Sequence, residues 1–512
     1  MKVKSQSIRQ TQDKQSKVKS DSKWYCLILL VILFLGAFLR LYRINEYMTF
    51  LGDEGRDMLV VKRMIVDHKF TLLGPITSVG SMYMGPVYYY MMVPFLWLWH
   101  LDPVGPAVMV ALFGVATIFL VYLTGATFFH PQVGLVASAL YAISRLPIVY
   151  GRSSWNPNVV PFFATLLVFS ILKAIVHKKP IFLILVFFSL GILIQLHYVT
   201  FMFFPIILTI FILLKPSVPK KYYVYSLISF LSAYSPFLFF ELRHNFVNTR
   251  QVIRFLFSTQ TNIGFLSFVS NFWQTASDIF IRSFWRLVVI ENAELSKIFL
   301  VVVIVSFYFF VKRKINKEKL LALKIVLLWF FVSVATFGFY RGVIYDYYLG
   351  SLFTAPFILS GIALFHIWQS GGKIKWFAPV IFCILVFFNL DNSPLKIEPN
   401  NMLKNTKTIA QFVLDKTEGK PYNFALLAPF NSDHAYRYFL ELWGRPPVTI
   451  ESPQNDPQRK TVTDRLMIVC EEKVCKPLGH PLWEIAGFGR AEIVGEWQVV
   501  TVKVYSLVHY KE

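Results

Sequence analysis

Charged residues are scarce in this chain of 512 residues. Only 16% are Asp, Glu, Lys or Arg, whereas 55% are hydrophobic and 17% are aromatic. An average soluble domain carries roughly 25% charged residues, so a soluble protein could not solvate a surface of this composition. The apolar residues form uncharged blocks of about 16 to 22 residues, long enough to cross a hydrocarbon core of about 30 Å. We therefore predict a polytopic α-helical membrane protein whose solvent is the lipid bilayer.

Acidic residues are fewer still, with 29 Asp and Glu against 51 Lys and Arg and a formal net charge of +22. The basic residues lie in short clusters between the apolar blocks, which is the pattern of cytoplasmic loops. No basic stripe interleaved with aromatic residues lies outside the blocks. We therefore expect no nucleic-acid partner.

Cysteine is also rare, and four residues are too few for a disulfide framework. Cys26 and Cys383 lie inside apolar blocks and are expected to pack as small hydrophobic residues. Cys470 and Cys475 could form a disulfide if they face an oxidising compartment, or remain free thiols.

The basic clusters predict the topology. Residues 1–23 form a basic, disordered tail held in the cytoplasm, and the clusters at 177–179, 215–221, 312–319 and 373–375 should face the same side. Eleven spans follow, which puts the C-terminal domain outside the cell membrane. They lie near residues 24–41, 104–123, 132–150, 158–176, 181–196, 199–214, 223–240, 296–311, 320–339, 349–368 and 376–390.

Residues 84–101 (MGPVYYYMMVPFLWLWHL) are apolar enough to form a twelfth span, which would break this parity. Pro86, Pro94 and the Tyr and Trp residues also suit an interfacial or broken helix. The sequence leaves both alternatives open, so about 11 to 12 membrane helices are expected.

The predicted outward segments are residues 42–83, 151–157, 241–295 and 340–348. Residues 24–390 thus form a membrane module, and residues 391–512 form a small extracytoplasmic α/β domain. That domain should contain a helix at 405–416 and strands near 422–429, 448–451, 465–469 and 497–508. It has no Gly-rich phosphate loop and no HExxH metal pair, so we expect an accessory or recognition domain.

An acidic motif stands directly after the first predicted span. Asp53 and Glu54 are followed by Arg56 and Asp57 at the start of a stretch with helical periodicity. Acids at a membrane surface are costly and require a reason. One interpretation is a helix N-cap by Asp53, with the other two acids favoured by the helix dipole. The other interpretation is that these acids take part in a catalysed reaction.

The motif and a following Gly-Pro-Val-Tyr-Tyr-Tyr element at 85–90 resemble the GT-C glycosyltransferases, which include protein O-mannosyltransferases and lipid A aminoarabinose transferases. GILIQLHYVTFMFFP at 191–205 looks like the family's span with a His-Tyr pair. SPFLFF at 235–240, with a long loop after it, and YDYYLGSLFTAPFILS at 345–360 are similar to the family in placement. The resemblance covers residues 24–390.

The resemblance implies transfer of a sugar from a polyprenyl-phosphate donor to a hydroxyl of a protein, lipid or glycan on the outer membrane face. The family's loop-one aspartate corresponds to Asp53, the expected general base, with Glu54 orienting the acceptor or a metal. The two adjacent acids could exchange these roles, and Arg56 or Asp57 could support either. Some members use a divalent metal, for which Glu54 and His197 are the candidates here.

The leaving phosphate needs positive charge, and a guanidinium can bind two of its oxygens at once. Arg341 and Arg152 are the first candidates on the outer face, and Arg243, next to His244, is the next. Each could instead be an interfacial anchor whose charged end reaches water.

His197 lies at an outward turn, where an imidazole could bind a sugar, a phosphate or a metal, or have a structural role. Tyr345 and Tyr347 have apolar faces and hydroxyl tips that suit a sugar ring, but they could equally belong to the aromatic belt.

Two other functions were weighed. A secondary transporter or lipid flippase would show internal repeats and polar residues at mid-membrane depth, whereas here no convincing repeat occurs and the acids cluster at one face. An O-antigen-type polymerase or ligase would lack the acidic loop after the first span.

Overall fold

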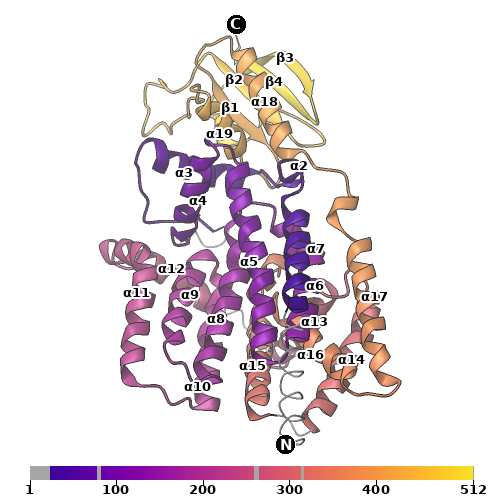
Figure 1. Ribbon diagram of the computed structural model, residues 1–512. Coiled ribbons are helices and arrows are strands. Elements are labelled where there is room, and N and C mark those ends of the chain that lie inside the picture. The colour runs from indigo at the N-terminus through magenta and orange to yellow at the C-terminus, as the bar shows by residue number, and fades with distance from the viewer. Residues whose placement is uncertain (1–22, 78–81, 259–264, 313–315, 511–512) are drawn as a thin grey trace, which may run out of the picture.

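The computed structural model describes residues 23–77, 82–258, 265–312 and 316–510. Its helices form one bundle, and a domain built around a β-sheet covers one end of that bundle (Figure 1). We call this the domain-bearing end. The short helix α2 (Ile44–Tyr47), directly after the first span, lies beneath the domain, where the Asn401 amide donates to the Glu46 carbonyl at 2.9 Å.

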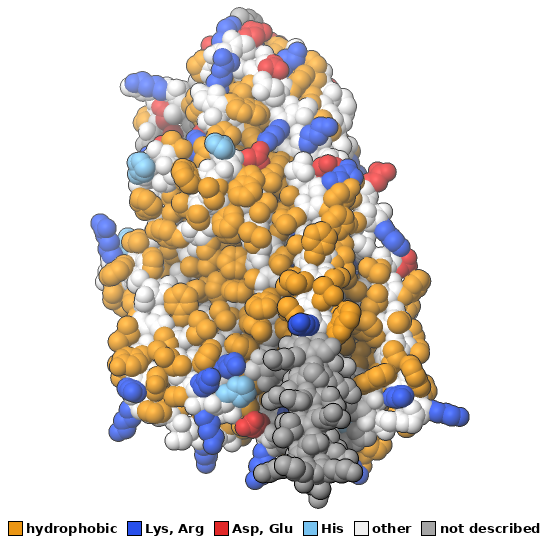
Figure 2. All heavy atoms as spheres, viewed as in Figure 1, with side chains coloured by type: hydrophobic (Ala, Val, Ile, Leu, Met, Phe, Trp, Pro, Cys, Tyr) orange, Lys and Arg blue, Asp and Glu red, His pale blue; other side chains and the backbone are white. Residues whose placement is uncertain are grey.

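Seven helices in the described ranges are long and apolar enough to cross a membrane, and Figure 2 shows a broad hydrophobic belt with charged side chains toward both ends. The chain is thus a polytopic helical membrane protein. The seven are Lys23–Leu41, Val104–Phe128, Asn156–Ile175, Lys220–Arg243, Ala293–Lys312, Lys317–Gly338 and Ile374–Lys396, and each overlaps a predicted span.

Five further apolar helices are shorter, so the total number of crossings stays a prediction. The bundle elements are α4 (Val87–Leu98), α5 (Val104–Phe128), α6 (Pro131–Ile143), α7 (Arg145–Tyr150), η1 (Asn156–Val159), α8 (Val160–Ile175), α9 (Phe182–Leu196), η2 (Tyr198–Met202), α10 (Phe203–Leu214), α11 (Lys220–Arg243), α12 (Val247–Ser258), α13 (Phe265–Trp285), α14 (Ala293–Lys312), α15 (Lys317–Gly338), η3 (Asp346–Ser351), α16 (Ala355–Trp368), η4 (Ile374–Trp376), α17 (Phe377–Asp391) and η5 (Pro394–Lys396).

Helix α4 bears on the question left open for residues 84–101. Its 12 residues give a length of about 18 Å, well short of a hydrocarbon core of about 30 Å. It lies beside α3 (Gly52–Val66) toward the domain-bearing end, and the Tyr90 hydroxyl donates to the Thr71 carbonyl in the segment that links the two helices (Figure 1). The interfacial alternative therefore fits α4 better than a straight crossing.

The prediction of one long loop over residues 241–295 was wrong, because this range contains α12 and α13. Helix α13 packs against α15, with the rings of Phe280 and Phe330 5.7 Å apart. Asp278 and Arg282, four residues apart, form a 2.5 Å ion pair on α13. Such polar residues interrupt the apolar run, which hid a packed helix from a search for uncharged blocks.

The C-terminal domain is an α/β unit, as predicted. Its four-stranded sheet has the order β1-β2-β4-β3, in which β1 and β2 are parallel and the other pairs are antiparallel. The elements are α18 (Met402–Thr417), β1 (Asn423–Leu427), α19 (His434–Leu442), β2 (Arg465–Cys470), α20 (Trp483–Ala486), β3 (Ala491–Val499) and β4 (Val502–His509).

Two strand predictions needed correction. Residues 497–508 were expected to form one strand, but they contribute to the β3–β4 hairpin, which turns at Val500 with φ 52°. Val448 forms only an isolated bridge with Asn423. The helix predicted at 405–416 is confirmed as α18.

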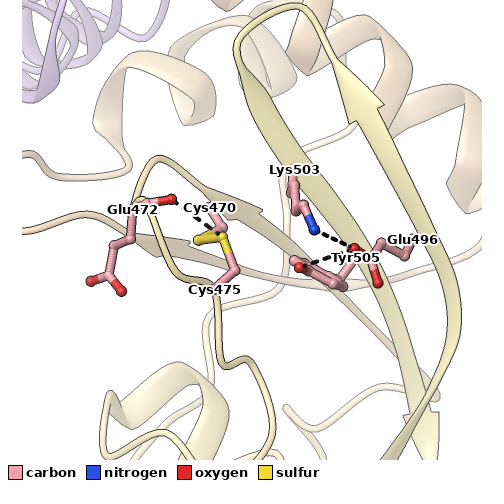
Figure 3. Close-up of a disulfide and its surroundings, with 6 residues drawn as sticks. All are labelled: Cys470, Glu472, Cys475, Glu496, Lys503 and Tyr505. Atoms are coloured by element: carbon pink, nitrogen blue, oxygen red, sulfur yellow. Dashed lines mark hydrogen bonds and ion pairs between the residues drawn. A yellow bond between two sulfur atoms is a disulfide. The ribbon is translucent and has the colours of Figure 1, made fainter.

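A disulfide joins Cys470, the last residue of β2, to Cys475 in the segment after it (Figure 3). Cys470 is paired across the sheet with Lys503, which forms a 2.7 Å ion pair with Glu496. Cys26 and Cys383 are free and exposed on the bundle surface, so they are not packed between its helices. Only one face of a membrane helix packs against other helices, and the sequence of an apolar block does not show which face is turned to lipid.

Candidate active site

The first turn of α3 carries the acidic motif, and one arginine joins two of its acids. The Arg56 Nη1 atom lies 2.9 Å from an Asp53 carboxylate oxygen, while Nε and Nη2 donate to the Asp57 Oδ1 atom at 3.0 and 2.9 Å. The Asp53 side chain is 54% exposed, whereas that of Asp57 is fully buried. Of the three acids in this turn, Asp53 is the one open to a ligand.

Glu54 and Asp57 face the interior. Glu54 accepts a hydrogen bond from the Leu51 amide at 3.0 Å, and burial raises the pKa of Glu54 to about 7. Asp57 accepts a hydrogen bond from the Tyr89 hydroxyl at 3.1 Å. Burial raises the pKa of Asp57 to about 6, although Arg56 favours its ionised form. These two acids hold the turn in place.

The expectation that Asp53 caps the helix was wrong, because α3 begins one residue earlier. The amide of Gly52, its first residue, donates to the Asn431 side-chain oxygen of the C-terminal domain at 2.8 Å. Asn431 donates in turn to both carboxylate oxygens of Glu471, at 3.2 and 3.0 Å. A distant domain therefore supplies an acceptor for one of the amides at the helix start, which have no partner within the helix.

Two glycines allow this close approach. A Cβ atom on Gly52 would lie 2.0 Å from the Ser432 hydroxyl oxygen, and one on Gly55 would lie 2.3 Å from the Ala435 amide nitrogen. Further along α3, Lys62 and Arg63 each lie 3.0 Å from a carboxylate oxygen of Glu441 on α19. Helix α19 is thus seated on α3.

The turn at residues 151–157 connects α3, which we call the acidic helix, to the segment 345–348, which we call the tyrosine-rich turn. The Ser153 hydroxyl accepts from the Thr49 amide at 2.9 Å, just before α3. The Ser154 and Tyr88 hydroxyls are hydrogen-bonded at 2.9 Å, next to the tyrosine that binds Asp57. The Trp155 ring lies 4.5 Å from that of Tyr347. Three segments far apart in sequence meet here.

Arg152 lies inside this arrangement and is only 1% exposed. Its Nη2 atom donates to the Tyr42 carbonyl at 2.7 Å, and its guanidinium lies 4.6 Å from the Tyr47 ring centroid. Burial lowers the pKa of Arg152 to about 10. These contacts fasten the residues after the first span, so a positioning role fits Arg152 better than an open anion site.

His197 packs against the tyrosine-rich turn, with ring centroids 5.7 Å from Tyr347 and 5.0 Å from Tyr348. Its Nδ1 atom accepts from the Val199 amide at 3.2 Å, and burial lowers the pKa of His197 to about 4. The imidazole is therefore neutral at physiological pH, with its proton on Nε2. It can donate a hydrogen bond but supplies no positive charge to a phosphate. Tyr345 stacks on Tyr347 and is 54% exposed.

The two remaining predicted arginines are exposed. Arg341 lies over the Phe268 ring at 5.6 Å, and Arg243 ends α11. The structure shows no bond from either one to the acidic turn. Sequence reasoning missed Arg286, whose Nε and Nη2 atoms lie 2.9 and 2.7 Å from Asp346 at the start of η3. Arg286 fell in the range 241–295, which was taken for a loop. The one available signal was its partner, the Asp of Tyr-Asp-Tyr-Tyr in the separate segment 340–348.

A divalent metal was considered for Glu54 and His197. Within the described ranges, no group of three or more His, Cys, Asp and Glu side chains could hold a metal ion. Glu54 binds the Leu51 amide, and His197 packs on tyrosines, so the two residues have different surroundings. The residues present do not fit a metal site, and no step below uses one.

The helical bundle with a sheet domain at one end has the same fold as two solved GT-C proteins, which confirms the predicted resemblance at the level of the fold. ArnT from Cupriavidus metallidurans, solved bound to undecaprenyl phosphate, matches with a TM-score of 0.58 and 12% identity, covering 95% of this chain and 98% of ArnT. The oligosaccharyltransferase AglB from Archaeoglobus fulgidus, solved with an inhibitory peptide and a dolichol-phosphate, matches with a TM-score of 0.52 and 12% identity, covering 95% and 74%. Searches of protein families and of curated proteins find no match.

Proposed function

We propose that the protein is a membrane glycosyltransferase that moves a sugar from a polyprenyl-phosphate donor to a hydroxyl acceptor. The observation that carries this proposal is the exposed Asp53 in the first turn of α3, just after the first span of a GT-C fold. Two similar structures, ArnT and AglB, were solved with a polyprenyl phosphate or a dolichol-phosphate bound, which supports a donor of this class.

The proposed reaction is a direct displacement at the anomeric carbon. Asp53 takes the proton of the acceptor hydroxyl as its oxygen forms the new bond to that carbon. The bond from this carbon to the phosphate oxygen breaks, and the lipid phosphate leaves with the electron pair. The leaving group is already an anion, so the site needs one carboxylate base rather than the two carboxylates of a glycosidase.

The donor is proposed to lie over the tyrosine-rich turn. Tyr345 and Tyr347 offer a stacked aromatic surface for a sugar ring, and His197 offers a neutral N–H donor. Arg341 is an exposed cation close in sequence to this turn and is the proposed partner of the phosphate, with Arg243 the second choice.

The domain-bearing end is proposed to face away from the cytoplasm, with the N-terminus inside. The basic clusters between the apolar blocks support this orientation. The Cys470–Cys475 disulfide supports it independently, because such bonds persist in oxidising compartments and are rare in the cytosol.

The test uses the purified full-length protein in liposomes with radiolabelled polyprenyl-phosphate sugars and a membrane extract as the acceptor source. Asp53→Asn is expected to lower the rate about 10²- to 10⁴-fold, the usual contribution of a general base. Asp67→Asn, at the exposed C-terminal end of the same helix, is the matched control and should retain wild-type activity.

Two results would count against the proposal in different ways. If the wild-type protein transfers no sugar from any such donor, yet moves a solute across the liposome membrane, the enzyme assignment fails and a transporter is favoured. If transfer occurs and Asp53→Asn leaves it intact, the base is another residue while the reaction class stands.

A further inference from the structure

A cleft of about 580 Å³ lies between the acidic helix and the C-terminal domain. Its walls come from α3, from α19 and from the segment at residues 446–449, with Glu484 of α20 at one side. This volume lies within the range of roughly 300 to 1,000 Å³ typical of small-molecule pockets. The reaction scheme proposed above gives this cleft no role.

The cleft adjoins the exposed acid. Arg56 lines its wall, and the same guanidinium lies 2.9 Å from Asp53. His434 lines the cleft from the domain side, and its neighbour Ala435 lies against Gly55 in the acidic turn. A molecule held in the cleft would therefore have one end beside the Asp53 carboxylate.

The charged groups of the cleft neutralise one another. Arg56 is bonded to Asp53 and Asp57, and Arg437 is bonded to Asp433. The third guanidinium of the lining, that of Arg63, is bonded to Glu441. Burial lowers the pKa of His434, so its ring adds little positive charge. No guanidinium is left over for a phosphate or carboxylate group of a ligand.

Glu484, unlike these paired guanidinium groups, brings to the cleft a charge that is unpaired within the described residues. It is half-buried, lines the cleft, and has no ion-pair partner in the part of the chain that the structure describes. A free carboxylate repels an anionic ligand and accepts hydrogen bonds from hydroxyl groups. Together with the paired guanidiniums, it favours a neutral ligand rich in hydroxyls.

The shape of the wall disfavours an extended peptide. In the segment 446–449 the backbone of Val448 is already engaged, because its amide donates to the Tyr422 carbonyl at 2.9 Å and its carbonyl accepts from the Asn423 side chain at 2.8 Å. A peptide that adds to a sheet needs an open strand edge. Leu59 and Val60 instead give the opposite wall an apolar patch, which suits the C–H face of a sugar ring.

We propose that this cleft binds the acceptor and that the acceptor is an uncharged saccharide, held by side-chain hydrogen bonds with one hydroxyl at Asp53. This inference rests on the proposed function, because only a glycosyltransferase has a sugar acceptor. The saccharide specificity of the cleft can be measured without any donor.

The experiment uses fluorescently labelled full-length protein in detergent on a printed array of neutral oligosaccharides, phosphorylated or uronic-acid saccharides, and peptides. Wild-type protein should be retained by neutral saccharides. Val60→Trp, which fills the cleft, and Glu484→Gln, which removes its free charge, should each weaken that retention at least about tenfold. The matched controls are Val66→Trp on the exposed end of α3 and Glu492→Gln on the exposed face of β3, which should bind as wild type.

Retention by anionic saccharides or peptides alone would overturn the inference, as would no retention at all. Neutral-saccharide binding that both cleft variants leave unchanged would place the site elsewhere and also overturn it. Sugar transfer is measured separately with the labelled donors. Cleft-dependent binding without transfer would refute the proposed enzyme activity and leave the saccharide site standing.

Discussion

Replacing Gly55 with alanine sets two effects of opposite sign against each other. Alanine in a helix interior is favoured over glycine by about 1 kcal/mol. In this structure, however, the added Cβ would lie 2.3 Å from the Ala435 nitrogen and 2.4 Å from its Cα, about 1 Å closer than ordinary contact. These are backbone atoms, so α19 would have to move away as a unit.

The magnitude follows from the contacts that this movement disturbs. Overpacking of this kind costs about 1 to 3 kcal/mol, and loss of the Asn431 hydrogen bond to Gly52 costs about 1 kcal/mol more. After the gain in helix propensity, Gly55→Ala should weaken docking by about 1 to 3 kcal/mol. A change of 1.4 kcal/mol alters the ratio of docked to undocked domain about tenfold.

Hydrogen exchange followed by mass spectrometry measures this change directly. Amides of α19 and of the first turn of α3 should exchange about tenfold faster in Gly55→Ala than in wild type, and sugar transfer should fall in parallel. Gly350→Ala is the control, because its Cβ would meet the nearest atoms at an ordinary 3.7 Å. Slower exchange and a higher thermal midpoint in Gly55→Ala, as helix propensity alone would give, would refute the docking argument.

Three further predictions follow. Burial raises the pKa of Glu54 from 4.5 to about 7, so the folded state favours the protonated carboxyl group, and the stability that this group contributes below pH 4.5 is lost as pH rises through 7. The thermal midpoint of the wild type should therefore fall between these pH values, and that of Glu54→Gln should fall less. Equal slopes for the two proteins would contradict this prediction. Replacing Cys470 and Cys475 with serine opens a loop of sequence separation 5 and should cost about 2 kcal/mol in thermal or denaturant unfolding, an effect that a reductant should reproduce on wild type. Arg341→Ala should raise the KM for the lipid-linked donor about tenfold without lowering the thermal midpoint, and an unchanged KM would move the phosphate elsewhere.

Much of the fold could be predicted because lipid imposes a simple rule on sequence. Apolar blocks such as 104–123 and 158–176 appear as α5 and as η1 with α8, since a spanning helix must satisfy its own backbone. Helix α13 was not predicted from the sequence, because polar residues such as Asp278 and Arg282 interrupt its apolar run and pair with each other along its surface. A helix whose polar residues pair along its surface does not look like an uncharged block in composition.

The candidate site was predicted less completely. Asp53 and Glu54 stood out because acids beside a membrane are costly, but sequence could not show that one faces solvent and the other the interior. Arg152 was selected for its charge, and only its contacts with Tyr42 and Tyr47 reveal a positioning role. The hydrogen bond from the Gly52 amide to Asn431 spans 379 residues and has no local signal.

That bond also has a consequence for biosynthesis. Ribosomes make the acidic turn early and make Asn431 and α19 only after the membrane helices. During that interval the start of α3 lacks its hydrogen-bond acceptor, and one wall of the cleft does not yet exist. A nascent or truncated chain would thus lie in the membrane with an incomplete site. The site would be complete only after the C-terminal domain has folded and docked on α3.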